Sequence, residues 1–258
     1  MTTTLAAVVE RLFDDASLFP PARLPMAAAL TAHQRLRRGP LAPMVGPFLY
    51  PASRFDELEA CLSSGLPRPP ELGVIAYGGD ARWAVIYAAP GIVQVEAPQA
   101  ARPPEPPRGV RRYVEIAPDA DPRALVAGLD AVAGSGARVK VRCGGLTPED
   151  VPGCDWLAAV LAGCVERGIT VKATAGLHHA FRSTGPDGPR HGLVNLLAAA
   201  GAAHAGADTA TLSEILAVEG DGTPALVERV GGAREVLASV GTCSIDETVE
   251  GLTARGLL

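Results

Sequence analysis

Two lysines stand out because the chain uses arginine at every other basic position. Of its 23 lysine and arginine residues, only Lys140 and Lys172 are lysine. Both lie in short apolar runs, residues 139–142 and 169–174, that are typical of buried strands. A buried ammonium costs on the order of several kcal/mol unless it is paired. Unlike arginine, a desolvated lysine can lose its proton and act as a nucleophile or base. The pattern therefore favours amine chemistry.

Strand and helix signals alternate along most of the chain. Strands are expected at residues 45–50, 72–77, 92–96, 112–117, 138–143, 169–174, 207–212 and 237–243, with helices between most of them, including one at 80–88. Eight strands alternating with helices in 258 residues is the pattern of a (β/α)8 TIM barrel, an α/β fold. An open doubly wound sheet is the alternative, but no Gly-rich phosphate loop follows the first expected strand.

The first 40 residues are expected to form an N-terminal helical segment that packs on the barrel, within a single (β/α)8-barrel domain spanning residues 1–258. Residues 4–13 and 25–38 have helical spacing. Between them Asp14 and Asp15 precede a Pro-Pro pair, and turn and capping roles are their simplest interpretation. A role as base or metal ligand at the barrel mouth is the alternative.

Strand parity brings several polar residues to one face, because alternate residues of a strand point to the same side. It places Glu115, Lys140, Arg142 and Lys172 in the barrel interior, near the C-terminal end where barrel enzymes build their sites. Lys140 and Arg142 are expected to lower the pKa of Lys172 by repulsion, together with desolvation. A neutral lysine is what Schiff-base chemistry requires. A buried ion-pair network that fills the barrel is the alternative.

Three short motifs between residues 138 and 176 resemble deoxyribose-phosphate aldolase and related class I aldolases. They are Val139-Lys-Val, Gly145-Leu-Thr-Pro-Glu149 and Val171-Lys-Ala-Thr-Ala-Gly176. In that family a strand-five lysine in a Lys-Val pair precedes a Val-Lys-Thr-Ser-Thr-Gly-type motif on strand six. The resemblance implies that Lys172 forms the Schiff base, that Lys140 is its neighbour, and that Glu115 stands where the family has a strand-four acid for proton transfer. The family's further lysine, on strand seven, has no counterpart in residues 207–212.

Residues 178–191, which follow the expected strand at 169–174, contain three of the five histidines. Histidine at a barrel mouth can move protons near neutral pH or bind a metal, although no HxH or HExxH spacing occurs here. Arg182 and His191 are candidates for binding an anionic group, assisted by the N-terminus of the helix that begins near Gly192. Packing of the loop is the alternative for these residues.

The stretch 241–244 follows the last expected strand and leads into a helix. Ser244 is a conventional N-cap at a position that often receives phosphate in barrels. Cys243 is a candidate nucleophile, with a buried thiol as the default interpretation. Glu214 is a weaker candidate acid.

Composition limits the class of protein. The net charge is −5 with no basic run, which argues against nucleic acid as a partner. Five irregularly spaced cysteines, no signal-like N-terminus and no apolar run of membrane-spanning length favour a cytoplasmic protein with reduced thiols. A homo-oligomer is compatible with these data.

These observations predict a cofactor-independent, aldolase-type lyase that acts on a small carbonyl metabolite, with an anionic group, through a Schiff base. The catalytic residues would be Lys172, Lys140, Glu115 and His178. The substrate-binding residues would be Arg142, Thr174, His179, Arg182, His191, Asn195 and Ser244.

Two alternatives remain open. One is a metal-dependent hydrolase or isomerase with a divalent metal at Asp14, Asp15, His178 and His191. The other is a non-catalytic barrel that binds or scaffolds, which a closed mouth or a fully paired, inaccessible Lys172 would favour.

Overall fold

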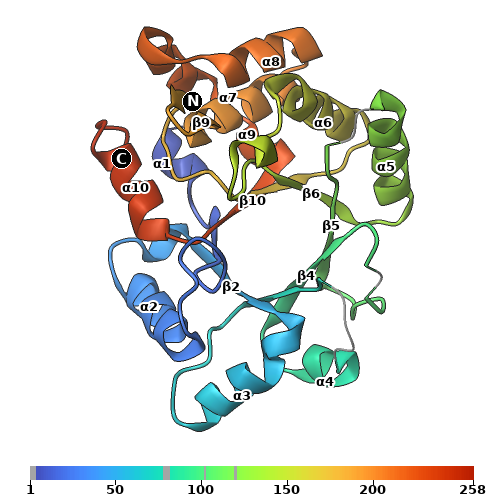
Figure 1. The fold of residues 1–258 in the computed structure, drawn as a ribbon, viewed down its shortest axis with the longest axis vertical. Coiled ribbons are helices and arrows are strands. Elements are labelled where there is room, and N and C mark those ends of the chain that lie inside the picture. The colour runs from blue at the N-terminus through green and yellow to red at the C-terminus, as the bar shows by residue number, and fades with distance from the viewer. Residues whose placement is uncertain (1–3, 78–81, 102, 119–120) are drawn as a thin grey trace.

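Eight parallel strands close into a barrel in the order β1-β10-β7-β6-β5-β4-β3-β2, with the helices on the outside (Figure 1). The computed structural model describes residues 4–77, 82–101, 103–118 and 121–258. The strands are β1 (Phe13–Asp15), β2 (Val45–Pro51), β3 (Leu72–Ile75), β4 (Ile92–Pro98), β5 (Arg111–Glu115), β6 (Arg138–Arg142), β7 (Val171–Thr174) and β10 (Leu237–Thr242). The fold is therefore a (β/α)8 TIM barrel, as the alternating pattern predicts.

The outer layer consists of helices that follow the strands. They are α1 (Leu5–Val8), α2 (Met26–Arg38), α3 (Phe55–Ser63), α4 (Trp83–Ala88), α5 (Pro122–Gly134), α6 (Cys154–Glu166), α7 (Leu193–His204), α8 (Thr209–Ala217), α9 (Ala233–Val236) and α10 (Ile245–Thr253). Short 3-10 helices are η1 (Ala42–Met44), η2 (Ala52–Arg54), η3 (Pro148–Asp150) and η4 (Gly220–Arg229). A small antiparallel hairpin, β8 (Ser183–Gly185) and β9 (Gly188–Arg190), lies between β7 and α7. The expected helix start at Asp80 lies outside the described residues.

The main apolar core lies between the sheet and the helices. Val139, Val141 and Val171, which alternate with the two lysines, are at most 1% exposed and belong to one large cluster with residues of α6 and α7. Because these valines face the helices, strand alternation turns the lysines into the barrel. Within the described residues, no helix is long and apolar enough to cross a membrane.

One predicted strand is absent from the barrel and one barrel strand was not predicted, so the number of strands is still eight. Residues 207–212 fall largely in helix α8, which Asp208 caps by accepting a hydrogen bond from the Thr211 amide at 2.8 Å. Leu212, Ile215 and Leu216 are the buried residues of α8, and their spacing of three and one residues is that of a helix face rather than of a strand. The missing strand is β1, which pairs with β10 and β2. Asp14 and Asp15 are therefore barrel residues, and their interpretation as turn residues is wrong.

Candidate active site at the barrel mouth and the ion-pair network beneath it

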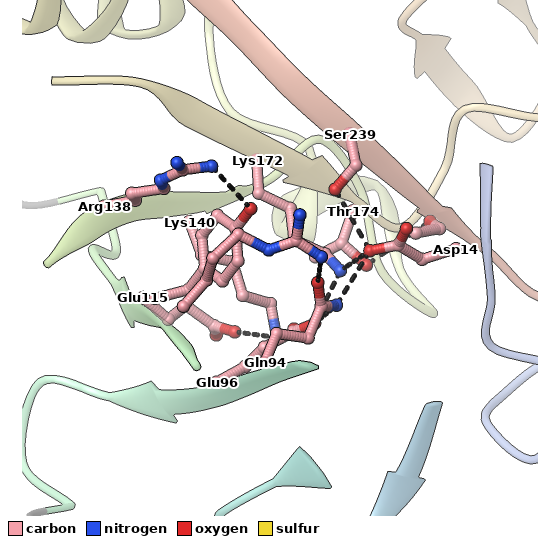
Figure 2. Close-up of polar contacts among 12 residues, drawn as sticks. Asp14, Gln94, Glu96, Glu115, Arg138, Lys140, Lys172, Thr174 and Ser239 are labelled. Carbon is pink, nitrogen blue, oxygen red and sulfur yellow. Dashed lines mark hydrogen bonds and ion pairs between the residues drawn. The ribbon is translucent and has the colours of Figure 1, made fainter. Parts of the chain in front are cut away.

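Charged residues from neighbouring strands form one row inside the barrel. Glu115 on β5 is in register with Lys140 on β6, and Lys140 is in register with Lys172 on β7. Ser239 on β10 continues the row beside Lys172. Figure 2 shows their side chains converging with those of Asp14, Gln94 and Glu96. The parity prediction is confirmed for Glu115, Lys140 and Lys172, because parallel strands in register bring equivalent residues together.

Lys172 is fully paired at the centre of this network. Its side chain is 0% exposed, and its Nζ contacts Asp14 and lies 2.5 Å from Glu96 Oε1. Burial alone would lower the pKa of Lys172, but attraction by Asp14 and Glu96 outweighs burial and raises the pKa above its ordinary value. The prediction that Lys140 and Arg142 lower this pKa is wrong, because two carboxylates lie nearer to Lys172 than any cation does.

Lys140 is also paired with two carboxylates, and it lies closer to the barrel mouth than Lys172 does. Its Nζ lies 2.9 Å from Glu96 Oε2 and 3.0 Å from Glu115 Oε2, and 5.9 Å from the centre of the Tyr77 ring. The carboxylates also raise the pKa of Lys140, against the effect of burial. Glu96 bridges the two lysines. Burial would raise the pKa of Glu96, yet Lys140 and Lys172 together lower it to about 2.

Two members of this network, Gln94 and Glu96, are not among the residues that sequence reasoning singles out. Asp14 Oδ2 accepts hydrogen bonds from Gln94 Nε2 at 2.9 Å and from Ser239 Oγ at 3.0 Å. Gln94 Nε2 also donates to Glu96 Oε1 at 3.0 Å. Gln94 and Glu96 alternate with Val93 and Val95 in an expected strand, so parity could have identified both of them. The sequence offers Asp14 only as a turn residue or, alternatively, as a base or metal ligand, and it gives no signal that Asp14 lies in a strand, because β1 has only three residues.

A cavity of about 330 Å³ opens at the C-terminal ends of the strands, above the network. Its lining includes Glu96, Lys140, Arg142, Thr174, His178, Cys243, Tyr77, Leu146, Pro20 and Pro21. The prediction that Arg142, Thr174 and His178 gather with Lys140 is therefore supported. Lys172 is not among the lining residues. The lysine that lines the cavity is Lys140, whose side chain is 4% exposed.

Backbone strain occurs at the rim of this cavity, where β7 ends. Ala175 has φ 61° and is followed by Gly176 with φ 71°, and both line the cavity. A non-glycine residue in the left-handed region costs about 1–3 kcal/mol, and such residues cluster at functional sites. Gly176 also lies close to Gly144 on the neighbouring loop, where an added Cβ would meet the Gly144 Cα at 3.0 Å.

A histidine and a thiol face each other on the cavity wall. His178 Nε2 lies 3.5 Å from Cys243 Sγ, and His178 Nδ1 lies 3.5 Å from Glu247 Oε2. Burial lowers the pKa of His178, although Glu247 opposes this effect, so the imidazole is neutral near pH 7. Burial raises the pKa of the Cys243 thiol. The pair therefore consists of a neutral base and a protonated thiol.

Four predicted substrate-binding residues lie elsewhere. His191 Nε2 lies 2.7 Å from the Pro152 carbonyl oxygen, and Arg182 Nε lies 3.2 Å from Glu219 Oε1. Asn195 is 0% exposed; it accepts from the Arg182 amide and donates to the carbonyls of Ile215 and Val218. These contacts hold the β8–β9 segment against α7 and α8. None of the three residues lines the mouth cavity, and neither does His179, which bridges to Gly192.

The remaining candidates have structural positions. Ser244 is the N-cap of α10 and accepts from the Glu247 amide at 3.2 Å, which confirms its conventional interpretation. Ser244 does not line the mouth cavity. Glu214 lies within helix α8 rather than at a strand end.

The residues of the alternative metal site are not assembled. Asp14 contacts Lys172, whereas Asp15 Oδ2 lies 2.9 Å from His33 Nδ1 and Asp15 Oδ1 accepts from the Ser17 amide. His178 and His191 have the separate partners described above. In the part of the chain that the structure describes, no group of three or more His, Cys, Asp or Glu residues is arranged to hold a metal ion.

A scan against protein-family models, a search of curated proteins and a search of solved structures each gave no match to the chain.

Proposed function

We propose that the chain is a cofactor-independent lyase of the aldolase type, which acts on a small carbonyl metabolite bound in the mouth cavity through a Schiff base on Lys140. The observation that carries the proposal is the position of Lys140. It is the lysine that lines the cavity, and two carboxylates hold its Nζ. Active sites of TIM barrels lie at this end of the strands.

The corrected strand count supports Lys140 over Lys172. With β1 included, Lys140 lies on the sixth strand and Lys172 on the seventh, and β4 carries Glu96. The aldolases that the chain resembles have their Schiff-base lysine on strand six, a further lysine on strand seven and an acid on strand four. This support comes from strand position alone. The motif Val171–Gly176, on which the resemblance rested, falls on and just after β7, one strand later than in the family.

The two carboxylates around Lys140 Nζ, those of Glu96 and Glu115, can stabilise an iminium ion as well as an ammonium ion. In the resting protein Lys140 is protonated, so one carboxylate must accept its proton before the amine can attack. Glu115 suits this step because its side chain is 14% exposed, against 1% for Glu96, and can exchange the proton with solvent. The amine attacks the carbonyl carbon, Glu115 returns its proton to the carbinolamine oxygen, and that oxygen leaves as water. The resulting iminium carries a positive charge that replaces that of the ammonium between the same two carboxylates.

Groups on the cavity wall can serve the later steps. A base takes the proton from the hydroxyl group on the substrate's β-carbon, whose oxygen becomes the carbonyl of the released fragment, while the electron pair of the broken carbon–carbon bond converts the iminium into an enamine. His178 is neutral and lines the cavity, so it suits the role of that base. Arg142 is exposed at the mouth and lies where an anionic end of the substrate would be.

Reductive trapping tests this proposal directly. The wild-type protein is incubated with a panel of small aldehydes and ketones plus cyanoborohydride, and adducts are mapped by mass spectrometry. The expected result is one adduct on Lys140, which is absent from Lys140→Met. Because the chain has only two lysines, an adduct on Lys172 would contradict the assignment without ambiguity. The absence of any lysine adduct on folded protein would rule out the Schiff base.

A second candidate follows from the raised pKa of Lys140. A lysine that stays protonated can stabilise an enolate without forming a covalent bond, while Glu115 removes a proton next to the carbonyl. That reaction would be an isomerisation. It predicts no trapped adduct but exchange of the substrate's α-proton with deuterated water, lost in Glu115→Gln. If neither an adduct nor α-proton exchange is observed, the result would favour the non-catalytic barrel. The fully paired Lys172 is compatible with that alternative.

A further inference from the structure

A second cavity, of about 340 Å³, lies at the opposite, N-terminal end of the barrel. Its lining includes Arg11, Arg111, Arg138, Arg234, Glu10, Asp14, Tyr113 and Ser239. Arg111 and Arg138 begin β5 and β6, and Arg234 lies in α9 just before β10. The cavity therefore reaches the underside of the ion-pair network, because Asp14 both lines it and contacts Lys172. Its size is within the range of small-molecule sites, about 300–1,000 Å³.

The wall of this cavity carries excess positive charge. Arg11 is paired with Glu71, and Asp14 is paired with Lys172. Three guanidinium groups, those of Arg111, Arg138 and Arg234, then face one further acid of the lining, Glu10. The balance is two positive charges, which matches a dianion. Phosphate groups carry about −1.5 to −2 at pH 7, whereas a single carboxylate carries only one charge.

Two of these arginines have buried donors without a partner among the described residues. They are Arg111 Nε and Arg234 Nη1. An unsatisfied buried donor destabilises the folded protein, and a charged one does so more strongly, so a bound acceptor at either nitrogen would be stabilising. Burial also lowers the pKa of Arg234, against the attraction of Asp14 and Tyr113.

The other contacts of Arg111 and Arg138 orient the guanidinium groups but use few of their N–H donors. Arg111 Nη2 donates to Gln94 Oε1 at 3.2 Å. Arg138 Nη1 lies 3.5 Å from the Tyr113 hydroxyl, and Arg138 Cζ lies 6.0 Å from the Tyr113 ring centre. Long contacts to neutral oxygens leave most of the guanidinium donors available, and a planar guanidinium matches phosphate oxygens in pairs.

We propose that this N-terminal cavity is a binding site for a small phosphate-bearing anion, held by Arg111, Arg138 and Arg234. The site lies at the end of the barrel away from the mouth, and it does not rest on the proposed lyase activity. An anion bound there would accept hydrogen bonds from the buried guanidinium donors that have no partner, so its binding would also stabilise the folded protein.

Calorimetric titration with inorganic phosphate, in a chloride buffer of low ionic strength, tests the site. The wild type is expected to bind one phosphate per chain, and Arg138→Gln is expected to weaken binding at least tenfold. Arg123→Gln is the matched control, because Arg123 is exposed on α5 and lines neither cavity, and it should bind as the wild type does. No saturable binding by the wild type would overturn the proposal, and so would an equal loss in Arg123→Gln.

Further titrations identify the ligand class and guard against misfolding. Arg138→Lys keeps the charge but not the planar fork, so it should bind phosphate with an affinity between the wild type and Arg138→Gln, and circular dichroism checks that each variant is folded. Methyl phosphate and acetate separate the sources of the charge. Tighter binding of methyl phosphate than of phosphate would indicate a phosphorylated metabolite, and the reverse would indicate free phosphate. Acetate binding as strongly as phosphate would overturn the match to a dianion.

Discussion

Removing Lys172 should destabilise the protein strongly at neutral pH and much less in acid. Lys172→Met deletes the cation that faces Asp14 and Glu96, whose side chains are each 1% exposed. Breaking a buried ion pair by removing one partner costs about 3–5 kcal/mol, because the remaining charge is left without compensation. That is a large part of a typical free energy of unfolding, about 5–15 kcal/mol.

The pKa of Glu96 gives an independent magnitude and the sign of the pH dependence. A decrease from 4.5 to about 2 corresponds to on the order of 3 kcal/mol of stability at pH 7. Because the folded pKa is the lower one, this stability is fully present above pH 4.5 and is lost as the pH falls towards 2. In Lys172→Met only Lys140 still lowers the pKa of Glu96, so the variant should lose less stability across the same window.

Urea denaturation of the wild type and Lys172→Met, followed by circular dichroism at several pH values from 7 to 3, measures both effects. Arg142→Met removes a cation from the exposed end of β6 and should change stability by no more than about 0.5 kcal/mol. Asp14→Asn alone and combined with Lys172→Met completes a double-mutant cycle, in which the two changes should not be additive. A loss below about 1 kcal/mol at pH 7, or the same pH dependence in both proteins, would refute the reasoning.

Two further predictions test the other assignments. Asn195→Leu should lower stability by about 2–4 kcal/mol in urea denaturation, because it removes the side-chain partner of the Arg182 amide and of the Val218 carbonyl and leaves the Ile215 carbonyl only a 3.4 Å bond from the Val218 amide. It should leave carbonyl trapping on Lys140 unchanged, and lost trapping with normal stability would restore its substrate-binding role. Cys243 should react slowly with iodoacetamide at pH 7 and faster above pH 9, since burial raises the pKa of its thiol. Rapid labelling at pH 7 that is abolished in His178→Gln would instead indicate a thiolate–imidazolium pair.

The barrel could be predicted from the sequence because its signals are local. Apolar runs bounded by turns identify strands such as β6 and β7, and helical spacing identifies α2, α5 and α7. Alternation within those strands also placed Lys140, Lys172 and Glu115 inside. Local signals failed where an element is short or atypical. β1 has three residues, two of them acidic, and α8 begins with β-branched threonines.

The state of the lysines could not be predicted, because it depends on partners that are distant in the chain. Lys172 lies 158 positions from Asp14, its partner on β1. The sequence suggested that cations surround Lys172, whereas barrel closure brings Asp14 and Glu96 to it and raises its pKa. Closure also decides which lysine the mouth exposes, and it directs Arg182, His191 and Asn195 away from the cavity.

By itself, the sequence determined most of the alternating elements and the inward row of Glu115, Lys140 and Lys172, because each depends on periodicity within a single strand or helix. The count of eight agrees with the barrel only because the wrong strand at residues 207–212 takes the place of β1. Only the tertiary structure decided the charge balance around the lysines, the position of Lys140 on the wall of the mouth cavity and the arginine-lined cavity at the opposite end. These properties are set by closing β1 against β10, which joins residues from the two ends of the chain. Electrostatic energy depends on distance in space, and periodicity carries no information about that distance.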